Sequence, residues 1–382
     1  MKKIVMIESQ EFFSDVKIGA HHYAERFAEN GYEVLWISPA FTPIHKFNKA
    51  IKIDERKKLS KGKRVELKKN IYGYSPKVYL PFVNVKLLNS KLVGKVYLYT
   101  AMPSIRRILK RLGFLDIDIL WISNIKMYYI KNIIRYNKLI HRIADDKKGF
   151  SNFFETLENF EKDIIRNADL VYATSTKLVE KFSPIRENIK YLPNGVNYQD
   201  FIPMDYSYPK DIQDLKDKKI CIYIGAIAEW LDFEKIIYSI ENLEEVNFLF
   251  IGPKHVDFSK IESYTNVRYL GKKQYNDLIN YLKVSNVAWI PFIKNDLTDA
   301  INPVKLYEYL AAGIPTVTTR LREIEDIDGP FRISGTKEEL VQDIKDCINS
   351  YYKKEDLIQY SKRNTWDQKF IQIINDINKL TT

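Results

Sequence analysis

The chain has 382 residues, of which 45% are hydrophobic, and its formal net charge is +11. This length exceeds what one ordinary core holds and indicates two domains, while the apolar content argues against a disordered chain. Its two cysteines, Cys221 and Cys347, exclude a disulfide framework and a thiolate metal site, and they fit a reducing cytoplasm.

The first element, MKKIVMIESQEFF, alternates like a strand, and no small-residue cleavage site follows it, so it does not read as a signal peptide. The best candidate for a membrane span, IDILWISNI, is broken soon afterwards by Lys126. No stretch reaches the ~18 apolar residues that a span requires. We therefore expect a soluble or peripheral protein.

In the first half of the chain, short β-branched or aromatic runs alternate with helical patterns, as is typical of parallel sheets with crossover helices. The predicted strands are KIVMIE, EVLWIS, DILWIS, LIHRIAD and LVYAT. The expected helices cover residues 20–30, 91–111 and 153–167. Gly19 opens the first helix directly after a strand loop, where free peptide N–H groups bind an anion, although a tight turn requires a glycine equally.

Positive charge gathers between Lys46 and Arg111, where nineteen Lys or Arg accompany three acidic residues. Such a region indicates an anionic partner. Its last part, KLLNSKLVGKVYLYTAMPSIRRILKRLGF, combines apolar residues with seven Lys or Arg, and predicts a helix that lies on an anionic membrane. A solvated basic face is the alternative, and no nucleic acid is expected because no motif for it is present.

The strand LIHRIAD ends in paired carboxylates, Asp145 and Asp146, at an edge where ligands bind in parallel sheets. Neighbouring carboxylates can differ in pKa, so one of the two is a candidate general base. Capping of the next helix is the alternative. The histidines His21, His22 and His141 lack metal-ligand spacing, and no metal site is expected.

The alternation of strand-like and helical segments is interrupted at the turn-rich Pro-Asn-Gly of YLPNGVNYQDF and resumes after it. The second half offers the strands KICIYIG, NFLFIG, NVRYLG, NVAWIPF and TVTT, with helices over 233–242, 275–284 and 304–312. We expect an α/β protein with two Rossmann-like, doubly wound domains that face each other across a cleft. The expected domains are residues 1–195 and 196–360, with a C-terminal helix in 361–382 packing back on the first domain.

In NPVKLYEYLAAGIP, Lys305 and Glu308 lie three residues apart and so on the same side of a helix. Taken alone, this pair reads as an ordinary surface ion pair.

Five segments of the second half, in order, carry a family resemblance: YIGAIAEWLDFEKI, FLFIGP, NVRYLGKKQYNDLINYL, VAWIPF and NPVKLYEYLAAGIPTVTT. They resemble the donor-binding domain of glycosyltransferases with the GT-B fold. The likeness is greatest to family 4-like bacterial enzymes that build capsule, teichuronic-acid and other surface polysaccharides. It extends to the first half through HRIADD, LVYATSTKL and YLPNGV, whereas residues 46–111 contain no segment that we can place.

The resemblance implies that Glu308 binds the ribose diol of a nucleotide sugar and that Lys305 stabilises the charge of the departing diphosphate. The remaining residues implied to contact the donor lie in strand-end loops or at the helix start: Gly19, Gly225, Gly271, Lys272, Tyr275 and Asn302. For Tyr275 the alternative is simple packing at a helix N-terminus.

Two departures from the family pattern are visible. Ala300 stands where relatives carry a first glutamate, with Thr298, Asp299 or Asn302 as substitutes. The loop AIAEWLD also lacks the cations that relatives use for phosphate, which shifts that role onto Lys305.

The resemblance and the basic segment together predict a glycosyltransferase that moves a sugar from a UDP-sugar to a polyisoprenyl-linked glycan in cell-surface polysaccharide biosynthesis. We expect it on the inner, cytoplasmic face of the membrane, held through residues 46–111, without cofactor or metal. The alternatives are a nucleotide-sugar epimerase of the same fold and a catalytically inactive binding subunit.

Overall fold

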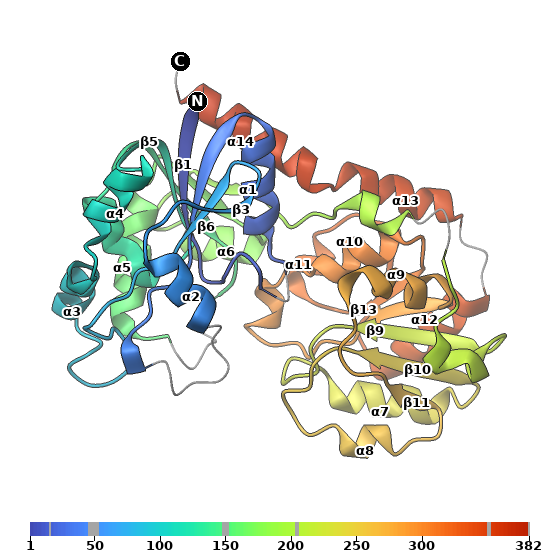
Figure 1. Ribbon diagram of the computed structural model, residues 1–382. Coiled ribbons are helices and arrows are strands. Elements are labelled where there is room, and N and C mark those ends of the chain that lie inside the picture. The colour runs from blue at the N-terminus through green and yellow to red at the C-terminus, as the bar shows by residue number, and fades with distance from the viewer. Residues whose placement is uncertain (15–16, 45–52, 147–152, 203–205, 350–352, 381–382) are drawn as a thin grey trace. The chain divides into compact units, whose positions relative to one another are not determined.

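The computed structural model describes the chain except residues 15–16, 45–52, 147–152, 203–205, 350–352 and 381–382. It separates into two compact units (Figure 1): unit 1 comprises Met1–Leu192 and Phe370–Thr382, and unit 2 comprises Pro193–Lys369. Unit 2 thus begins at the Pro-Asn-Gly turn, next to the expected boundary at residue 195.

Within the described ranges, unit 1 holds one eight-stranded sheet in the order β3-β4-β2-β1-β5-β6-β7-β8. Only β3 runs antiparallel to its neighbour among these pairs. The strands are β1 (Lys2–Ile7), β2 (Tyr32–Ile37), β3 (Val65–Lys68), β4 (Ile71–Tyr74), β5 (Asp116–Ile122), β6 (Arg135–Ile143), β7 (Leu170–Ala173) and β8 (Ile189–Tyr191).

The connections of unit 1 are helical, and the centre of its sheet is fully buried. In β1 the run from Ile4 to Ile7 has no exposed surface, as expected for a parallel strand covered on both faces. The helices are α1 (Gly19–Glu29), α2 (Ile53–Ser60), α3 (Lys91–Val96), α4 (Ile105–Leu112), α5 (Glu155–Asn167) and α6 (Thr176–Phe182), with 3-10 turns η2 (Tyr97–Thr100) and η3 (Ile125–Asn132).

The five strands predicted for the first half are confirmed as β1, β2, β5, β6 and β7, whereas β3, β4, β8 and α2 were not foreseen. The single helix expected over 91–111 is wrong. The Ser90 hydroxyl caps α3 by accepting from the Val93 N–H at 3.3 Å, and Ser104 caps α4 in the same way. Between them lies Pro103, which lacks an N–H and prevents a helix from continuing.

The break between α3 and α4 bears on the prediction of a helix that lies on an anionic membrane. The apolar side of α4 (Ile105, Ile108, Leu109 and Leu112) is buried in unit 1, so this helix does not offer an apolar face to a bilayer. Residues 46–52 of the basic segment lie outside the described residues. No helix in the described ranges has both the length and the apolarity needed to cross a membrane.

Unit 2 contains, as far as the structure describes it, a six-stranded parallel sheet in the order β11-β10-β9-β12-β13-β14. The strands are β9 (Lys219–Ile224), β10 (Val246–Ile251), β11 (Val267–Tyr269), β12 (Val287–Ile290), β13 (Thr316–Thr319) and β14 (Arg332–Ser334). The first five confirm the predicted strands of the second half.

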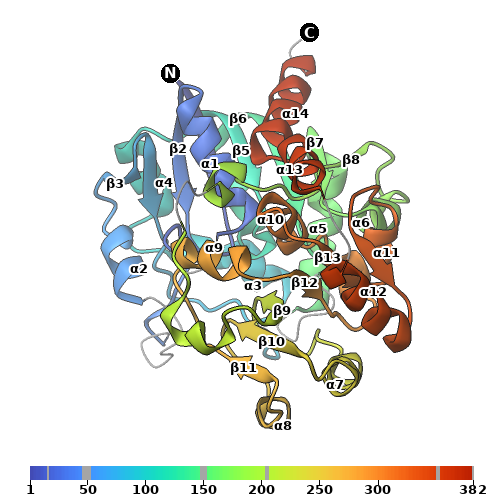
Figure 2. The ribbon, with the colours of Figure 1, turned by 90° about the vertical axis from the view of Figure 1, so that its right-hand side faces the viewer.

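Helices lie on both faces of the unit 2 sheet, with α9 and α10 on one side and α7 and α8 on the other (Figure 1 and Figure 2). The helices are α7 (Phe233–Asn242), α8 (Ser259–Glu262), α9 (Tyr275–Lys283), α10 (Val304–Ala311), α11 (Arg322–Glu325), α12 (Lys337–Asn349) and α13 (Lys354–Arg363), with turns η5 (Tyr198–Phe201), η6 (Lys210–Leu215) and η7 (Thr298–Ala300). The predicted helices over 233–242, 275–284 and 304–312 are confirmed.

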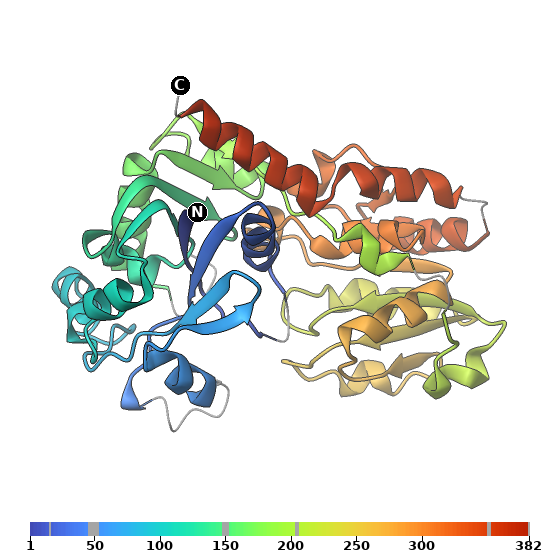
Figure 3. The ribbon, with the colours of Figure 1, turned by 45° about the horizontal axis from the view of Figure 1, so that its top comes forward.

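The last helix, α14 (Trp366–Lys379), begins in unit 2 and ends in unit 1; Figure 3 shows it in red, running to the C-terminus. Within unit 1, the Phe370 ring packs edge-to-face on Phe27 of α1, with 4.9 Å between the centroids. The Asp376 carboxylate accepts from the Tyr172 hydroxyl at 3.1 Å and pairs with Lys190. These contacts join the end of the chain to β7 and β8.

Candidate functional site

Three glycines follow neighbouring strands of unit 2: Gly225 after β9, Gly252 after β10 and Gly271 after β11. The Gly225 N–H donates to the Ile251 carbonyl at 2.8 Å, and the Gly252 N–H donates to the Gly271 carbonyl at 3.0 Å. A Cβ on Gly252 would lie 2.1 Å from the Gly225 oxygen, which no side chain tolerates. At the carboxyl edge of these strands, the first two glycines are therefore needed for the close packing of the strand ends, whereas nothing lies within 4 Å of a Cβ position on Gly271, so a ligand can approach the backbone there.

Lys305 on α10 brings its ammonium to this edge. A Cβ on Gly225 would lie 2.7 Å from Lys305 Nζ, so the charge sits directly at the Gly225 backbone. Nζ also lies 5.4 Å from the centroid of Tyr223 and 5.5 Å from that of Phe292. Burial lowers the pKa of Lys305, and the nearby Glu308 partly opposes this. The side chain is thus a fixed, partly desolvated cation.

Glu308, one helical turn further along α10, is also partly buried. In the described part of the chain it forms no ion pair with Lys305, so the surface ion pair considered from the sequence is not what the structure contains. Burial raises the pKa of Glu308 to about 7, Lys305 opposes the rise, and Asp200 adds to it. Tyr275, at the start of α9, lies close enough to Glu308 and Asp200 for both to act on it electrostatically: burial, and then these two carboxyl groups, raise the pKa of its hydroxyl.

The structure therefore brings together, within unit 2, a carboxyl group of perturbed pKa, a desolvated lysine and an open backbone edge. Such a combination is typical of a functional site. It includes Gly225, Gly271, Tyr275 and both residues of α10. Sequence reasoning missed Asp200, whose only signal was its place in the turn-rich segment YLPNGVNYQDF.

Two other candidate donor residues are placed differently. Asn302 is 2% exposed, and its side chain accepts from the Asn194 N–H at 3.0 Å and donates to Glu323 Oε1 at 2.9 Å. Asn302 therefore anchors the loop before α10 to Asn194 and Glu323. Lys272 is exposed beside Gly271.

The proposed substitutes for the missing family glutamate also take part in loop structure. The Thr298 hydroxyl is buried and donates to the Ile293 carbonyl, while Asp299 Oδ1 accepts from the Arg322 N–H at 3.0 Å. Together with buried Asn302, these side chains help to hold the loop before α10 in place.

In unit 1, the two carboxylates after β6 have separate surroundings. Asp146 accepts from Lys181 Nζ on α6 through both oxygens, at 2.6 and 2.5 Å. Asp145 is exposed. Gly19 is buried at the start of α1, where the His21 imidazole accepts from the Ile18 N–H at 3.0 Å and closes the first turn.

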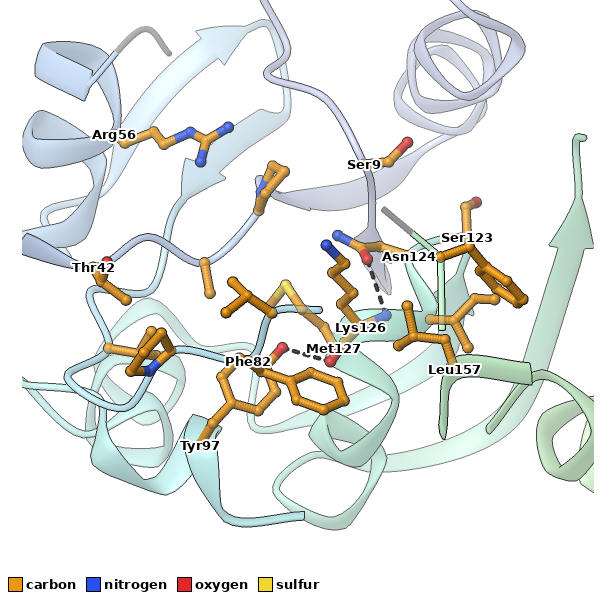
Figure 4. Close-up of a pocket in the computed structure, with 17 residues that line it drawn as sticks. Ser9, Thr42, Arg56, Phe82, Tyr97, Ser123, Asn124, Lys126, Met127 and Leu157 are labelled. Carbon is orange, nitrogen blue, oxygen red and sulfur yellow. Dashed lines mark hydrogen bonds between the residues drawn. The ribbon is translucent and has the colours of Figure 1, made fainter. Parts of the chain in front are cut away.

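Unit 1 also contains a cavity of about 440 Å³, drawn in Figure 4. It opens among loops that follow β1, β2, β4 and β5, represented by Ser9, Pro39, Val78 and Asn124. Its floor includes Lys126 at the start of η3. The carboxyl ends of these strands are where doubly wound sheets bind ligands, but sequence reasoning had not singled out any lining residue as a site.

A buried carboxyl group supports the wall of this cavity. Glu8, which follows β1 and has no exposed surface, accepts from the Ser123 hydroxyl at 3.1 Å, and its carbonyl accepts from the Asn124 amide at 3.1 Å. The Ser123 hydroxyl in turn accepts from the Trp121 indole at 3.0 Å. This chain of hydrogen bonds holds the loop after β5 against β1.

Two family models match the chain. Residues 6–174 match the N-terminal domain of glucuronosyltransferase GumK, and residues 218–350 match the glycosyl transferases group 1. TuaH of Bacillus subtilis (strain 168), named as a teichuronic acid biosynthesis glycosyltransferase, is 26% identical over 185 residues, which are 46% of this chain and 47% of TuaH. The chain thus spans about half the length of the curated relative that it matches.

Solved structures with the same architecture cover the whole chain. Sucrose-phosphate synthase of Thermosynechococcus elongatus superposes with a TM-score of 0.71 at 14% identity, over 100% of this chain and 99% of that one. Anabaena HepE, in complex with UDP and glucose, gives a TM-score of 0.66 at 14% identity, over 99% of this chain and 100% of HepE. The two Rossmann-like units show the GT-B fold, and both domain matches confirm the resemblance to GT-B glycosyltransferases of surface-polysaccharide biosynthesis.

Proposed function

We propose that this protein transfers a sugar from a UDP-sugar to a lipid-linked glycan acceptor at the cytoplasmic face of the membrane. The observation that carries the proposal is the cluster in unit 2 formed by Lys305, Glu308, Tyr275 and the strand-end glycines. Similarity to HepE, whose structures contain UDP, supports uracil as the base of the donor nucleotide. Similarity to TuaH supports a surface polysaccharide as the product.

The chemistry of the donor matches the groups in this cluster. A ribose diol donates two hydrogen bonds, and a carboxylate such as Glu308 accepts both. The diphosphate becomes more negative as the sugar departs, and a cation fixed in advance, here Lys305, stabilises that charge. Binding of the diphosphate also places negative charge next to the partly buried Lys305 ammonium, which offsets part of its desolvation cost. We expect the reaction to need neither metal nor cofactor.

On the acceptor side, Asp145 is our candidate general base. Asp146 is engaged by Lys181, and an ion pair of this kind holds a carboxylate in place rather than leaving it to accept a proton from substrate. Asp145, being exposed at the carboxyl end of β6, is accessible to an acceptor hydroxyl.

Membrane association is supported by the exposed apolar side chains of residues 79–102. Leu87 is 79% exposed, Leu92 is 70% exposed and Met102 is 66% exposed. The exposed residues of α4 that follow them are all basic: Arg106, Arg107, Lys110 and Arg111. Apolar side chains enter the interface while each Lys or Arg near an anionic bilayer contributes about 1 kcal/mol.

The test is calorimetric titration of UDP and turnover with a panel of UDP-sugars, including UDP-glucose and UDP-glucuronic acid. We expect Glu308→Ala to weaken UDP binding by about 1.5 to 3 kcal/mol, the cost of losing a charged hydrogen-bond partner. Lys305→Ala should mainly slow transfer. The control is Glu244→Ala, which removes an exposed carboxyl group from a turn. Unchanged UDP affinity in folded Glu308→Ala would refute the assignment of the donor site.

Two alternatives predict different products. A nucleotide-sugar epimerase would convert the UDP-sugar without any acceptor, and an inactive binding subunit would bind UDP without turnover. The second alternative is worth testing because Ala300 stands where relatives carry a glutamate near the donor sugar. Release of UDP that depends on added acceptor separates the proposed transferase from both.

A further inference from the structure

The cavity in unit 1 has mostly apolar walls. The Phe82 and Tyr97 rings pack in a tilted arrangement with 5.3 Å between their centroids, and Met127 and Leu157 line the cavity from η3 and α5. One of its two cations is already neutralised, because Arg56 pairs with Glu11 at 2.5 Å and donates a second hydrogen bond to it at 2.6 Å. Only the other cation, Lys126, is left to attract a ligand among the described lining residues.

Lys126 is built into the cavity by its backbone. Its N–H donates to Asn124 Oδ1 at 3.1 Å, and its carbonyl accepts from the Tyr97 hydroxyl at 2.5 Å. The side chain points into the cavity (Figure 4), and the ammonium has no hydrogen bond or ion pair with any residue that the structure describes. Burial lowers its pKa. A half-buried cation without a counter-ion is unfavourable, and a bound anion offsets that cost.

We propose that this cavity binds an acidic group of the acceptor, a carboxylate or a phosphate, through Lys126, while an adjoining apolar part of the acceptor packs on Phe82 and Met127. Lys126 then determines specificity by distinguishing acidic from neutral acceptors. The identification of the ligand as the acceptor rests on the proposed function. The binding itself takes place in unit 1 and does not involve the donor cluster of unit 2. A carboxylate would come from a uronic acid in the glycan, and a phosphate would come from the lipid carrier.

Paired probes that differ only in charge test the proposal by calorimetry on the full chain. Octyl glucuronide is compared with octyl glucoside, and farnesyl phosphate is compared with farnesol. We expect the wild type to bind at least one acidic probe about ten- to a hundredfold more tightly than its neutral partner, the range for one charge-assisted hydrogen bond. Preference for the glucuronide assigns the acid to the glycan, and preference for the phosphate assigns it to the lipid.

Three variants locate the effect. Lys126→Met should abolish the preference for the acidic probe, whereas Lys126→Arg should keep most of it. Lys138→Met, which removes a partly buried charge from the first half of β6, is the matched control and should behave as wild type. Ala40→Phe fills part of the cavity without touching the charge and should weaken acidic and neutral probes alike.

Several results would overturn the proposal: equal binding of acidic and neutral probes by the wild type, no binding of either acidic probe, a preference that survives in Lys126→Met, or full binding in Ala40→Phe. Failure of the proposed function is seen separately, as absence of UDP binding while the acidic probe still binds. If Lys126→Met does not fold, Ala40→Phe and Lys126→Arg still decide the outcome.

Discussion

Replacing Glu308 by Gln is expected to stabilise the free protein at alkaline pH while weakening its binding of UDP. Burial raises the pKa of this carboxyl group from its usual 4.5 to about 7. Between these two values the folded chain holds a proton that the unfolded chain has lost, so the free energy of unfolding falls as the pH rises through this window. Above pH 7 the folded protein carries the whole cost of a buried charge.

The size of the effect follows from that shift. A carboxyl group with a pKa of 4.5 when unfolded and about 7 when folded costs about 3 kcal/mol at pH 8 and under about 1 kcal/mol at pH 5. Gln has no ionisable proton to lose, and its side chain has nearly the same size and shape as that of Glu. Glu308→Gln should therefore gain up to about 3 kcal/mol of stability at pH 8 and little at pH 5.

Urea unfolding of unit 2 at both pH values, followed through tryptophan fluorescence, measures this gain. The control is Glu244→Gln, an exposed carboxyl group that should show no pH-dependent difference. UDP titration of the same samples should show a loss of about ten- to a hundredfold in affinity. If Glu308→Gln is no more stable than the control at pH 8, the carboxyl group is not buried as described. If it is more stable but binds UDP normally, the ribose assignment is refuted.

Three further outcomes are expected. Gly252→Ala places a Cβ 2.1 Å from the Gly225 oxygen, so the strand ends must separate; urea unfolding should show a loss of about 1 to 3 kcal/mol, and a neutral result would contradict the close approach. Asp145→Asn should reduce turnover by roughly two to four powers of ten with UDP affinity retained, whereas Asp146→Asn should chiefly lower the melting temperature by breaking its pair with Lys181; full activity of both variants removes them from the mechanism. Changing exposed basic residues of α4 to Gln should release the protein from anionic vesicles in sedimentation while sparing transfer to a short soluble acceptor. Added salt should also release the protein, because the electrostatic attraction decays within about 8 Å. Equal binding of the wild type to neutral vesicles would refute the membrane proposal. The residues changed are Arg106, Arg107 and Lys110, with Arg111 kept because it donates to the Lys61 carbonyl at 2.6 Å.

The sequence by itself determined the class of fold and most of the strands. Parallel strands covered on both faces are continuous apolar runs, and β1 and β10 are recognisable for that reason. The pairing of Lys305 with Glu308 was also accessible, since residues three apart on a helix share a side whatever the tertiary structure.

Short polar segments gave weaker local signals. The strands β3, β4 and β8 were missed because a charged residue or a glycine interrupts their few apolar residues, whereas the equally short β7 and β12 are continuous apolar runs. The helix expected over 91–111 was wrong for a related reason. The amphipathic spacing of the side chains continues across Pro103, but the helical backbone does not.

Tertiary structure alone decided which distant residues meet. The order of strands in the sheet sets Lys305 against Gly225, eighty positions earlier, and packing brings Asp200 and Tyr275 to Glu308. The cavity around Lys126 gathers the ends of four strands. These contacts depend on strand order and on the paths of loops, which leave no periodic trace in the chain. The sequence therefore indicated which elements form, and only folding determined which side chains they bring together.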